Sequence, residues 1–302
     1  MKRTILLLTF AVLALCVSAQ KRDKAVVKKE KQLVGDFVEI PAQHIAVDVL
    51  DVETGEVIGQ KEITLAKICM LKTEVSRASY NAFLEDLKAQ GRMADYEKAR
   101  VHDKEWDTLI QKYKDLKAPE LGEYPVANIS YEGALLFCQW LTDKVGSSEW
   151  EYTLPDKVDW QMAAKGGNPV ESYADGAPFT PLDAYRYTFF NIHADCLTKA
   201  GDGYRAVPWM LAPQPYNVNI LKLKNGEKYI SVNPATTPVV SHNPNPYGLY
   251  NMCGNVAEMV YGESIALGGS WADPGYDIRI QSEKTFTGPS PMVGFRVIAV
   301  RK

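Results

Sequence analysis

Apolar residues repeat with the spacing of an α-helix in four stretches of the first half of the chain. In residues 76–90 and 94–114 they recur at intervals of three and four, which places them on one face of a helix. A third helix is predicted from Ser130, a good N-cap residue, to Gly146, and a fourth over residues 156–165. The aromatic stripes on these helices are typical of core packing and need no ligand to explain them.

Strands are predicted on both sides of this helical region. From Phe37 the chain alternates apolar and polar positions, with a turn at residues 53–56 and a returning strand that reaches Leu71. A last strand is predicted over residues 295–300, and between residue 167 and that strand regular periodicity fades. Long irregular segments inside a compact domain are usually functional or held by disulfides or metal ions. We therefore expect disulfides or metal ions, in addition to β-sheet hydrogen bonds, to stabilise this region.

The first nineteen residues have the organisation of a secretory signal peptide. Two basic residues precede an apolar run over residues 5–17, and small side chains lead up to Ala19. The run is short for a membrane span, so we expect export with cleavage after Ala19, to the periplasm, the cell envelope or the extracellular space. Lipidation at Cys16 is the alternative, but a leucine precedes this cysteine where lipoprotein signals have a small residue.

Charge changes along the chain. Residues 20–34 are rich in lysine and lack an apolar period, so we interpret them as a flexible basic leader before one domain at residues 35–302. The chain has 34 Lys and Arg against 37 Asp and Glu, and removal of residues 1–19 leaves 32 basic residues and a net charge of −5. A general nucleic-acid binder needs a basic stripe and is excluded as a class. Contact of the leader with a membrane is expected to be peripheral at most.

Export places four cysteines where disulfides are permitted, namely Cys69, Cys138, Cys196 and Cys253. Four cysteines allow three complete pairings, and all three remain open at this point. The sequence has no C-x-x-C pair and no H-x-x-x-H pair, so neither a zinc cage nor a thioredoxin-type redox pair is supported.

Six phrases occur in a fixed order along the chain. They are EVS from Glu74, YPVANISYEGALLFCQWL from Tyr124, LPDKVDWQMAAKGG from Leu154, NPYGLYNMCGNVAEM from Asn245, GGSW from Gly268 and GFRV from Gly294. Together they resemble the sulfatase-modifying factor, or formylglycine-generating enzyme, family, from about residue 35 to the C-terminus. The resemblance implies a single α+β domain with the formylglycine-generating-enzyme fold, which is related to C-type lectin folds and contains much irregular backbone.

Oxygen donors in GLYNMCGNVAEM are spaced so that they can meet at one hard cation. Asn251 and Glu258 are seven residues apart, and Gly254 between them lets the backbone turn its carbonyls toward the same point. Calcium takes about six to eight such oxygens. The resemblance implies a calcium ion held here by the side chains of Asn251 and Glu258 and the carbonyls of Gly254 and Val256.

A second calcium loop is implied for the stretch FFNIHADCLTKAGDGY. By the same resemblance its ligands are the side chains of Asn191 and Asp202 and the carbonyls of Ile192 and Tyr204. A plain Asp-Gly turn at Asp202 would have the same sequence, and that alternative stays open.

The active centre that the resemblance implies is degenerate. Active formylglycine-generating enzymes hold copper(I) through two cysteines five residues apart just after GGS, because thiolates are the soft ligands that copper(I) prefers. In GGSWADPGYDIR these positions are Asp273 and Ile278, and only Ser270 of the site is retained. The ergothioneine-type branch of the fold needs an iron-binding H-x-x-x-H-x-E stretch, which the sequence lacks. We therefore expect neither catalytic residues nor bound copper.

Three functions are compatible with this pattern. The leading hypothesis is an exported, non-catalytic scaffold or binding protein for an envelope protein or peptide, as in family members of gliding motility and type IX secretion machines. The first alternative is an enzyme with altered chemistry that uses Ser270, Asp273 and Arg279. The second is a glycan or peptide receptor that uses the Tyr- and Pro-rich insertion at residues 205–235.

Overall fold

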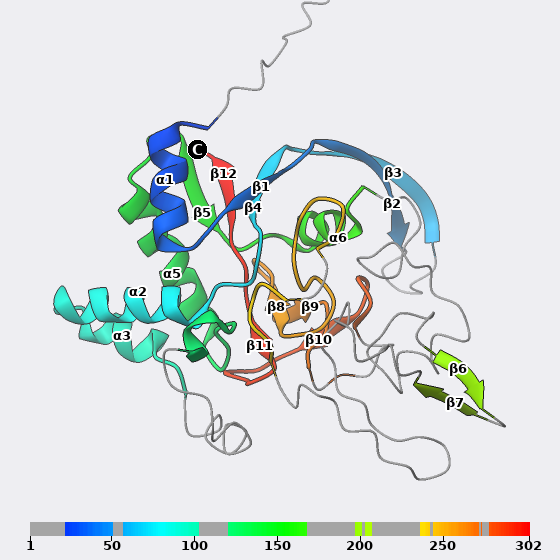
Figure 1. Ribbon diagram of the computed structural model, residues 1–302. Helices are drawn as coiled ribbons and strands as arrows, with labels where there is room; N and C mark the ends of the chain where they lie inside the picture. Colours follow the sequence, from blue (N-terminus) through cyan, green and yellow to red (C-terminus); the bar gives the residue numbers. More distant parts are fainter. Residues whose placement is uncertain are drawn as a thin grey trace, which may run out of the picture.

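The structure is a computed structural model. It describes residues 22–50, 57–102, 120–167, 197–200, 203–206, 236–241, 244–271, 273 and 278–302. Within these ranges the structure contains two four-stranded sheets and a long β-ribbon, with most of the helices on one side and the helix of residues 157–165 apart from them (Figure 1).

The first sheet joins the two ends of the domain. Its order is β1 (Phe37–Ile40), β4 (Ile68–Leu71), β12 (Ile298–Arg301) and β5 (Trp150–Thr153), and every neighbouring pair is antiparallel. The C-terminal strand β12 therefore lies between β4 and β5 (Figure 1). The last strand was predicted over residues 295–300 and begins later, at Ile298. Of the residues before it, Val297 accepts the N–H of Leu71 at the end of β4, and Phe295 accepts the N–H of Val75 in the connection that follows.

The second sheet brings two sequence phrases together. Its order is β10 (Glu283–Thr285), β9 (Ile265–Leu267), β8 (Ala257–Met259) and β11 (Val293–Gly294). Strand β11 runs parallel to β8, with Gly294 opposite Glu258. A Cβ atom on Gly294 would lie 2.5 Å from the Val126 carbonyl oxygen, so only glycine fits at this crossing. The GFRV phrase is thereby held beside the GNVAEM phrase.

Three of the four predicted helices are confirmed. They are α2 (Arg77–Ala89), α5 (Tyr131–Val145) and α6 (Lys157–Lys165), and their N-caps Ser76, Ser130 and Asp156 each accept a hydrogen bond from a backbone N–H three residues on. Gly146 and Gly166 end the last two helices in the left-handed conformation, which glycine adopts without strain. A short 3₁₀ helix, η2 (Glu120–Glu123), precedes α5. None of the helices in the described ranges is both long enough and apolar enough to cross a membrane.

The predicted helix over residues 94–114 is wrong as a continuous element. Helix α3 covers Met93–Ala99 and ends where Arg100 turns to φ −55° and ψ 147°. The Ala99 carbonyl accepts a hydrogen bond from the Tyr80 hydroxyl at 2.8 Å, and the backbone N–H of His102 donates to Asn128. Beyond Ala99 the backbone therefore forms a hydrogen bond with the segment at Asn128 and does not continue the helix. Residues 103–119, which make up the rest of the prediction, lie outside the described residues.

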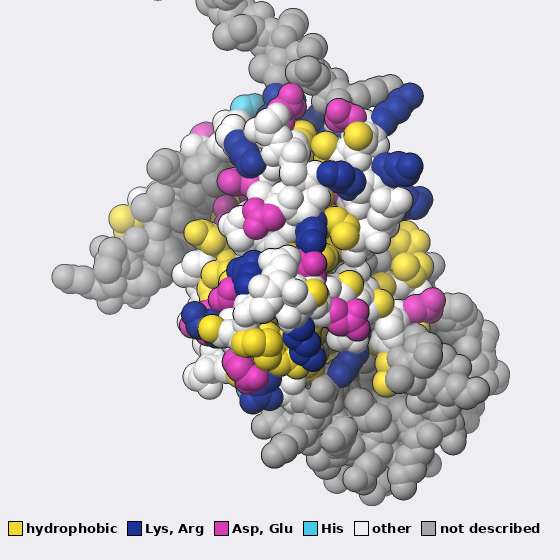
Figure 2. Space-filling view, turned by 90° about the vertical axis from the view of Figure 1, so that its left-hand side faces the viewer, with side chains coloured by type: hydrophobic (Ala, Val, Ile, Leu, Met, Phe, Trp, Pro, Cys, Tyr) yellow, Lys and Arg dark blue, Asp and Glu magenta, His cyan; other side chains and the backbone are white. Residues whose placement is uncertain are grey.

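The expectation of a flexible leader is wrong for residues 24–33. They form helix α1 (Lys24–Leu33), which Asp23 caps by accepting the N–H of Ala25. Glu30 on its inner side is 1% exposed, and it forms an ion pair with Arg22 and accepts the Tyr152 hydroxyl. A buried carboxylate needs such partners, and one of them, Tyr152, comes from β5, which sequence periodicity does not reveal. Figure 2 shows the face of the molecule on this side.

Two β-ribbons complete the described elements. The predicted strand from Phe37 is divided into β1 and β2 (Gln43–Leu50), and the returning strand predicted to reach Leu71 is divided into β3 (Val57–Leu65) and β4. Strands β2 and β3 pair in antiparallel register, and residues 51–56 between them are not described. A short pair, β6 (Leu197–Ala200) and β7 (Gly203–Ala206), lies in the stretch where periodicity fades.

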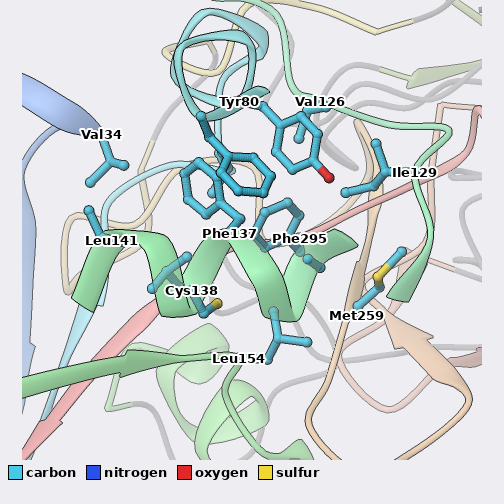
Figure 3. Close-up of a cluster of buried hydrophobic side chains, with 14 of the residues drawn as sticks. Val34, Tyr80, Val126, Ile129, Phe137, Cys138, Leu141, Leu154, Met259 and Phe295 are labelled. Atoms are coloured by element: carbon cyan, nitrogen blue, oxygen red, sulfur yellow. The ribbon is translucent and has the colours of Figure 1, made fainter. Parts of the chain in front are cut away.

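The aromatic stripes of α2 and α5 meet in the core, as predicted (Figure 3). The ring of Phe137 stacks on Tyr80 at 5.5 Å between centroids and makes edge contacts with Phe83 and Phe295 at 5.5 and 5.4 Å. All four side chains are fully buried. Aromatic pairs in these geometries add to the free energy of burial, so this cluster fastens both helices to the C-terminal segment.

Phe137→Ala is expected to lower the free energy of unfolding by about 3 to 5 kcal/mol, because it removes a buried ring and leaves a cavity among three others. Urea denaturation followed by circular dichroism measures this. The exposed Glu85→Ala on α2 is the control and should change stability by less than about 0.5 kcal/mol. A similar small effect of Phe137→Ala would show that the cluster is not part of the stabilising core.

Candidate functional site

A buried ion pair lies at the centre of the residues implicated by the sequence. Glu258 of β8 accepts two hydrogen bonds from Arg296, from Nε to Oε2 at 2.5 Å and from Nη2 to Oε1 at 2.6 Å. The indole N–H of Trp160 on α6 donates to the same Oε2 at 2.7 Å. All three side chains are at most 1% exposed. Such a two-pronged contact of guanidinium with carboxylate is among the strongest polar interactions in proteins.

The fold positions each partner by a separate contact. Since Gly294 of β11 lies opposite Glu258, Arg296 two residues later reaches back to the carboxylate. Gly268 makes room for Trp160, because a Cβ atom there would lie 3.0 Å from the indole ring and 2.7 Å from a backbone oxygen. Gly268 also has φ +81°, which favours glycine.

Arg296 uses its remaining N–H groups to join three segments. Nη1 donates to the carbonyls of Leu71 at 3.2 Å and Lys72 at 3.3 Å, and Nη2 donates to the carbonyl of Tyr250 at 2.8 Å. Burial favours a neutral guanidine, but the charge and hydrogen bonds of Glu258 outweigh it and raise the pKa of Arg296 above its ordinary value. The guanidinium is therefore a fixed buried cation.

A second buried carboxyl group lies beside this pair. Glu74, 1% exposed, accepts the Nδ2 groups of Asn255 at 2.7 Å and Asn251 at 3.1 Å. Burial raises the pKa of Glu74 to about 8, Arg296 opposes that rise, and Glu258 adds to it. Asn251 and Asn255 adopt positive φ angles of 53° and 65°, which asparagine tolerates better than most residues.

The four ligands implied for the first calcium ion lie in one buried segment, which runs from the loop at Asn251 into strand β8. All four residues are buried: Asn251 is 5% exposed, Val256 and Glu258 are 1% exposed, and Gly254 lies buried between them. The Oδ1 atom of Asn251 is buried and has no hydrogen-bond partner, as expected of a ligand oxygen. Glu258 already binds Arg296 and Trp160, yet a carboxylate has about four lone-pair positions, so a cation can share it. The donor set thus fits a hard cation.

The ligands implied for the second calcium ion are not brought together in the described residues. Asn191, Ile192 and Asp202 lie outside them, and Tyr204 lies in β7, where only the backbone is described. In the part of the chain that the structure describes, no three His, Cys, Asp or Glu side chains form a group that could hold a metal ion. The first calcium set contains one such side chain, so that search does not bear on it.

The degenerate copper positions form a closed polar cluster and a core residue. Asp273 accepts the hydroxyl of Ser270 at 2.6 Å and its backbone N–H at 2.8 Å. The ammonium group of Lys284 on β10 donates to both Asp273 oxygens, at 2.7 and 2.9 Å, and to the sulfur of Met292 at 3.6 Å. Ile278 is fully buried among apolar side chains of the second core cluster.

The sequence left the disulfide pairing open, and in the structure the three described cysteines form no disulfide with one another. Cys69, Cys138 and Cys253 are buried thiols, and Cys196 lies outside the described residues. Burial raises the pKa values of Cys69 and Cys138, although Arg22 partly counteracts this at Cys69. Both groups therefore have little thiolate character.

Sequence reasoning did not identify four residues of the site: Glu74, Trp160, Lys284 and Arg296. Glu74, Trp160 and Arg296 lie inside the phrases that carry the family resemblance, next to residues that became buried. A charged or indole side chain in such an apolar context is a signal of a buried polar network. Lys284 lies outside these phrases, and its sequence position carries no comparable signal.

Comparison with known proteins identifies the family. Residues 23–301 match the family described as the sulfatase-modifying factor enzyme 1-like domain, and the chain belongs to this family. The formylglycine-generating enzyme of Thermomonospora curvata is 26% identical over 135 residues, which are 45% of this chain and 32% of that enzyme. The chain is thus matched over less than half the length of this curated relative.

Solved structures confirm the α+β formylglycine-generating-enzyme fold. PvdO from Pseudomonas aeruginosa is similar with a TM-score of 0.52 at 17% identity, covering 88% of this chain and 94% of that one. Treponema denticola variable protein 1 is similar with a TM-score of 0.51 at 17% identity, covering 88% of this chain and 95% of that one. At these identities the likeness concerns the fold alone.

Glu258→Ala is expected to lower the free energy of unfolding by about 3 to 5 kcal/mol, because it leaves the Arg296 guanidinium buried without a counter-charge. Urea denaturation measures the change. Glu39→Ala, which breaks the exposed pair of Glu39 with Lys67, is the control and should cost at most about 1 kcal/mol. Equal effects of the two substitutions would contradict the central role of the buried pair.

Proposed function

We propose that this protein is an exported, non-catalytic member of its family, which acts as a scaffold or binding protein for an envelope protein or peptide. The observation that carries the proposal is the cluster of Ser270, Asp273 and Lys284 at the position where the family resemblance implies a copper site. The signal-like sequence of residues 1–19 supports export.

The polar groups of Ser270, Asp273 and Lys284 already bind one another. Both Asp273 oxygens already accept hydrogen bonds, and Lys284 directs its ammonium protons at Asp273 and at the sulfur of Met292. A carboxylate neutralised by an ammonium group is a hard ligand, whereas copper(I) prefers soft thiolates. Ile278 at the second position offers no donor atom. These features favour a structural role for the former active centre.

The same geometry disfavours the enzyme alternative. Ser270 is 0% exposed, so a substrate cannot reach its hydroxyl in this conformation. The hydroxyl and the backbone N–H of Ser270 both donate to Asp273, three residues later. A nucleophile has to approach the reacting atom within hydrogen-bond distance. The receptor alternative rests on residues 205–235, of which only 205 and 206 are described.

A structural calcium ion is the second part of the proposal. The side chains of Asn251 and Glu258 and the carbonyls of Gly254 and Val256 would hold it, and the unpartnered Asn251 oxygen supports this assignment. When bound, the ion would supply a positive charge that neutralises ligand oxygens and fixes the loop. Copper has no comparable donor set among the described residues, where the three cysteines are dispersed and buried.

The purified protein, loaded with copper, is expected not to convert the cysteine of a sulfatase-type peptide to formylglycine, since Asp273 and Ile278 cannot hold copper(I). The measurement is the mass of the peptide after incubation. The Thermomonospora curvata formylglycine-generating enzyme, assayed in parallel, is the positive control.

Turnover by the unmodified protein would overturn the non-catalytic proposal and favour the enzyme alternative. The scaffold role has its own test. A tagged mature protein should co-purify with one envelope protein or peptide at a fixed ratio after gel filtration. A protein that stays monomeric in envelope extract would contradict a scaffold even if the peptide assay is negative.

Calcium is expected to raise the melting temperature, because a ligand that binds only the folded state adds about 2.7 kcal/mol at a hundredfold excess over its Kd. Thermal unfolding with calcium and with a chelator measures the difference. Asn251→Ala should abolish that difference because it removes a ligand oxygen.

Asn128→Ala is the matched control, since Asn128 is also buried, has positive φ and carries an unpartnered Oδ1, but lies outside the calcium set. This variant should lose stability and keep its response to calcium. A melting temperature of the natural sequence that calcium and chelator leave unchanged would refute the calcium site.

A further inference from the structure

The outer side of helix α1 carries a row of lysines. Lys24, Lys28 and Lys31 follow one another at intervals of four and three, which places them on one side of the helix, and all three are exposed. The opposite side packs on the domain through the buried Glu30 and the partly buried Val26. We call the row of Lys24, Lys28 and Lys31 the basic face of α1.

These lysines contribute little to holding the fold. In the described ranges no acidic group lies within ion-pair distance of Lys24 or Lys28. Lys31 lies 3.4 Å from Asp36, but their side chains are 68% and 42% exposed, so water and salt weaken that pair. The helix is instead anchored from its inner side, by Glu30 with Arg22 and by Lys29, which donates to the Val145 carbonyl at 3.0 Å.

Charge is distributed unevenly between this helix and the rest of the chain. Residues 20–34 contain six basic and two acidic residues, whereas residues 35–302 contain 26 basic and 35 acidic residues, a net charge of −9. An anionic surface would therefore attract residues 20–34 and, on balance, repel the rest of the mature chain. Since screening limits such forces to about 8 to 10 Å at physiological salt, the helix in contact dominates the attraction.

The C-terminus adds positive charge next to α1. Arg22, just before the helix, and Arg301 of β12 lie over the ring of Trp150 at 5.0 and 5.5 Å, so the start of α1 and the C-terminal strand meet at this residue. Arg301 and Lys302 are exposed. Figure 1 shows the C-terminus beside α1, and Figure 2 shows dark-blue Lys and Arg side chains along the upper part of that face, with acidic groups among them.

We propose that the basic face of α1 is a docking surface for an anionic phospholipid bilayer. The three lysines span about 10 Å along the outer side of the helix, at about 1.5 Å per residue. All three charges can therefore contact a flat surface at once. Lysines act as flexible point charges and lack the fixed fork that arginine uses for a shaped acidic site. Val27, 41% exposed, lies three residues after Lys24 and four before Lys31 and adds a small apolar contact at the same surface.

The hollow beside the helix does not explain the row. It has a volume of about 430 Å³ and is lined by residues that include Asp23, Lys29, Glu149 and Trp150. Its lining carries both signs of charge, so it does not select an anion. None of the three lysines of the basic face lines it. The membrane contact does not depend on whether the domain is catalytic.

The test is co-sedimentation of the mature protein, residues 20–302, with vesicles at about 50 mM salt. Vesicles with 30% phosphatidylglycerol should bind it and pure phosphatidylcholine vesicles should not, and about 300 mM salt should abolish binding. One basic residue near an anionic bilayer contributes about a fivefold gain in partitioning, so Lys24→Gln with Lys28→Gln should weaken binding about 30-fold.

Lys88→Gln with Lys98→Gln, exposed lysines on α2 and α3, is the control of equal charge change. It should reduce binding by less than about threefold, and the helix content of both variants should be unchanged because glutamine is nearly as good a helix former as lysine. Absence of binding at low salt, equal loss in both variants, or binding to dextran sulfate but not to anionic vesicles would each overturn the proposal.

Discussion

The ion pair of Glu258 and Arg296 connects segments of this fold that are far apart in sequence. Two buried charges are stable only if each is neutralised and hydrogen-bonded, so both side chains need their partners at the same time. Arg296 meets that requirement with carbonyls after β4 and at Tyr250, and Glu258 meets it with Trp160 of α6. The two sheets and a helix are therefore joined at one point.

This constraint also shapes the surroundings of the pair. Gly268 and Gly294 are required because the indole and the neighbouring backbone leave no room for a side chain. Glu74, Asn251 and Asn255 form a second layer of polar contacts next to the pair. Several of the phrases that carry the family resemblance thus describe one buried polar network, which explains why a chain can keep them while its copper positions differ.

The two positions that the family resemblance assigns to copper are occupied by side chains with partners inside the fold. The Asp273 carboxylate recruits Lys284 from β10 and the hydroxyl and N–H of Ser270, which together satisfy its charge and its oxygens. Ile278 joins the second core cluster. Both side chains are thereby held by contacts within the fold, Asp273 by polar partners and Ile278 by apolar ones.

Local signals in the sequence determined the helices with clear caps, Ser76, Ser130 and Asp156, and the phrases determined the family, because both depend on residues close along the chain. The sequence also indicated Asn251, Glu258, Ser270 and Asp273 as candidate site residues. Only the tertiary structure decided that Arg296 pairs with Glu258, that Lys284 closes on Asp273, and that the lysine-rich segment docks as α1 through Glu30. These contacts join residues far apart in the chain, and a buried charge selects its partner by what the fold brings near, which hydrophobic periodicity does not encode.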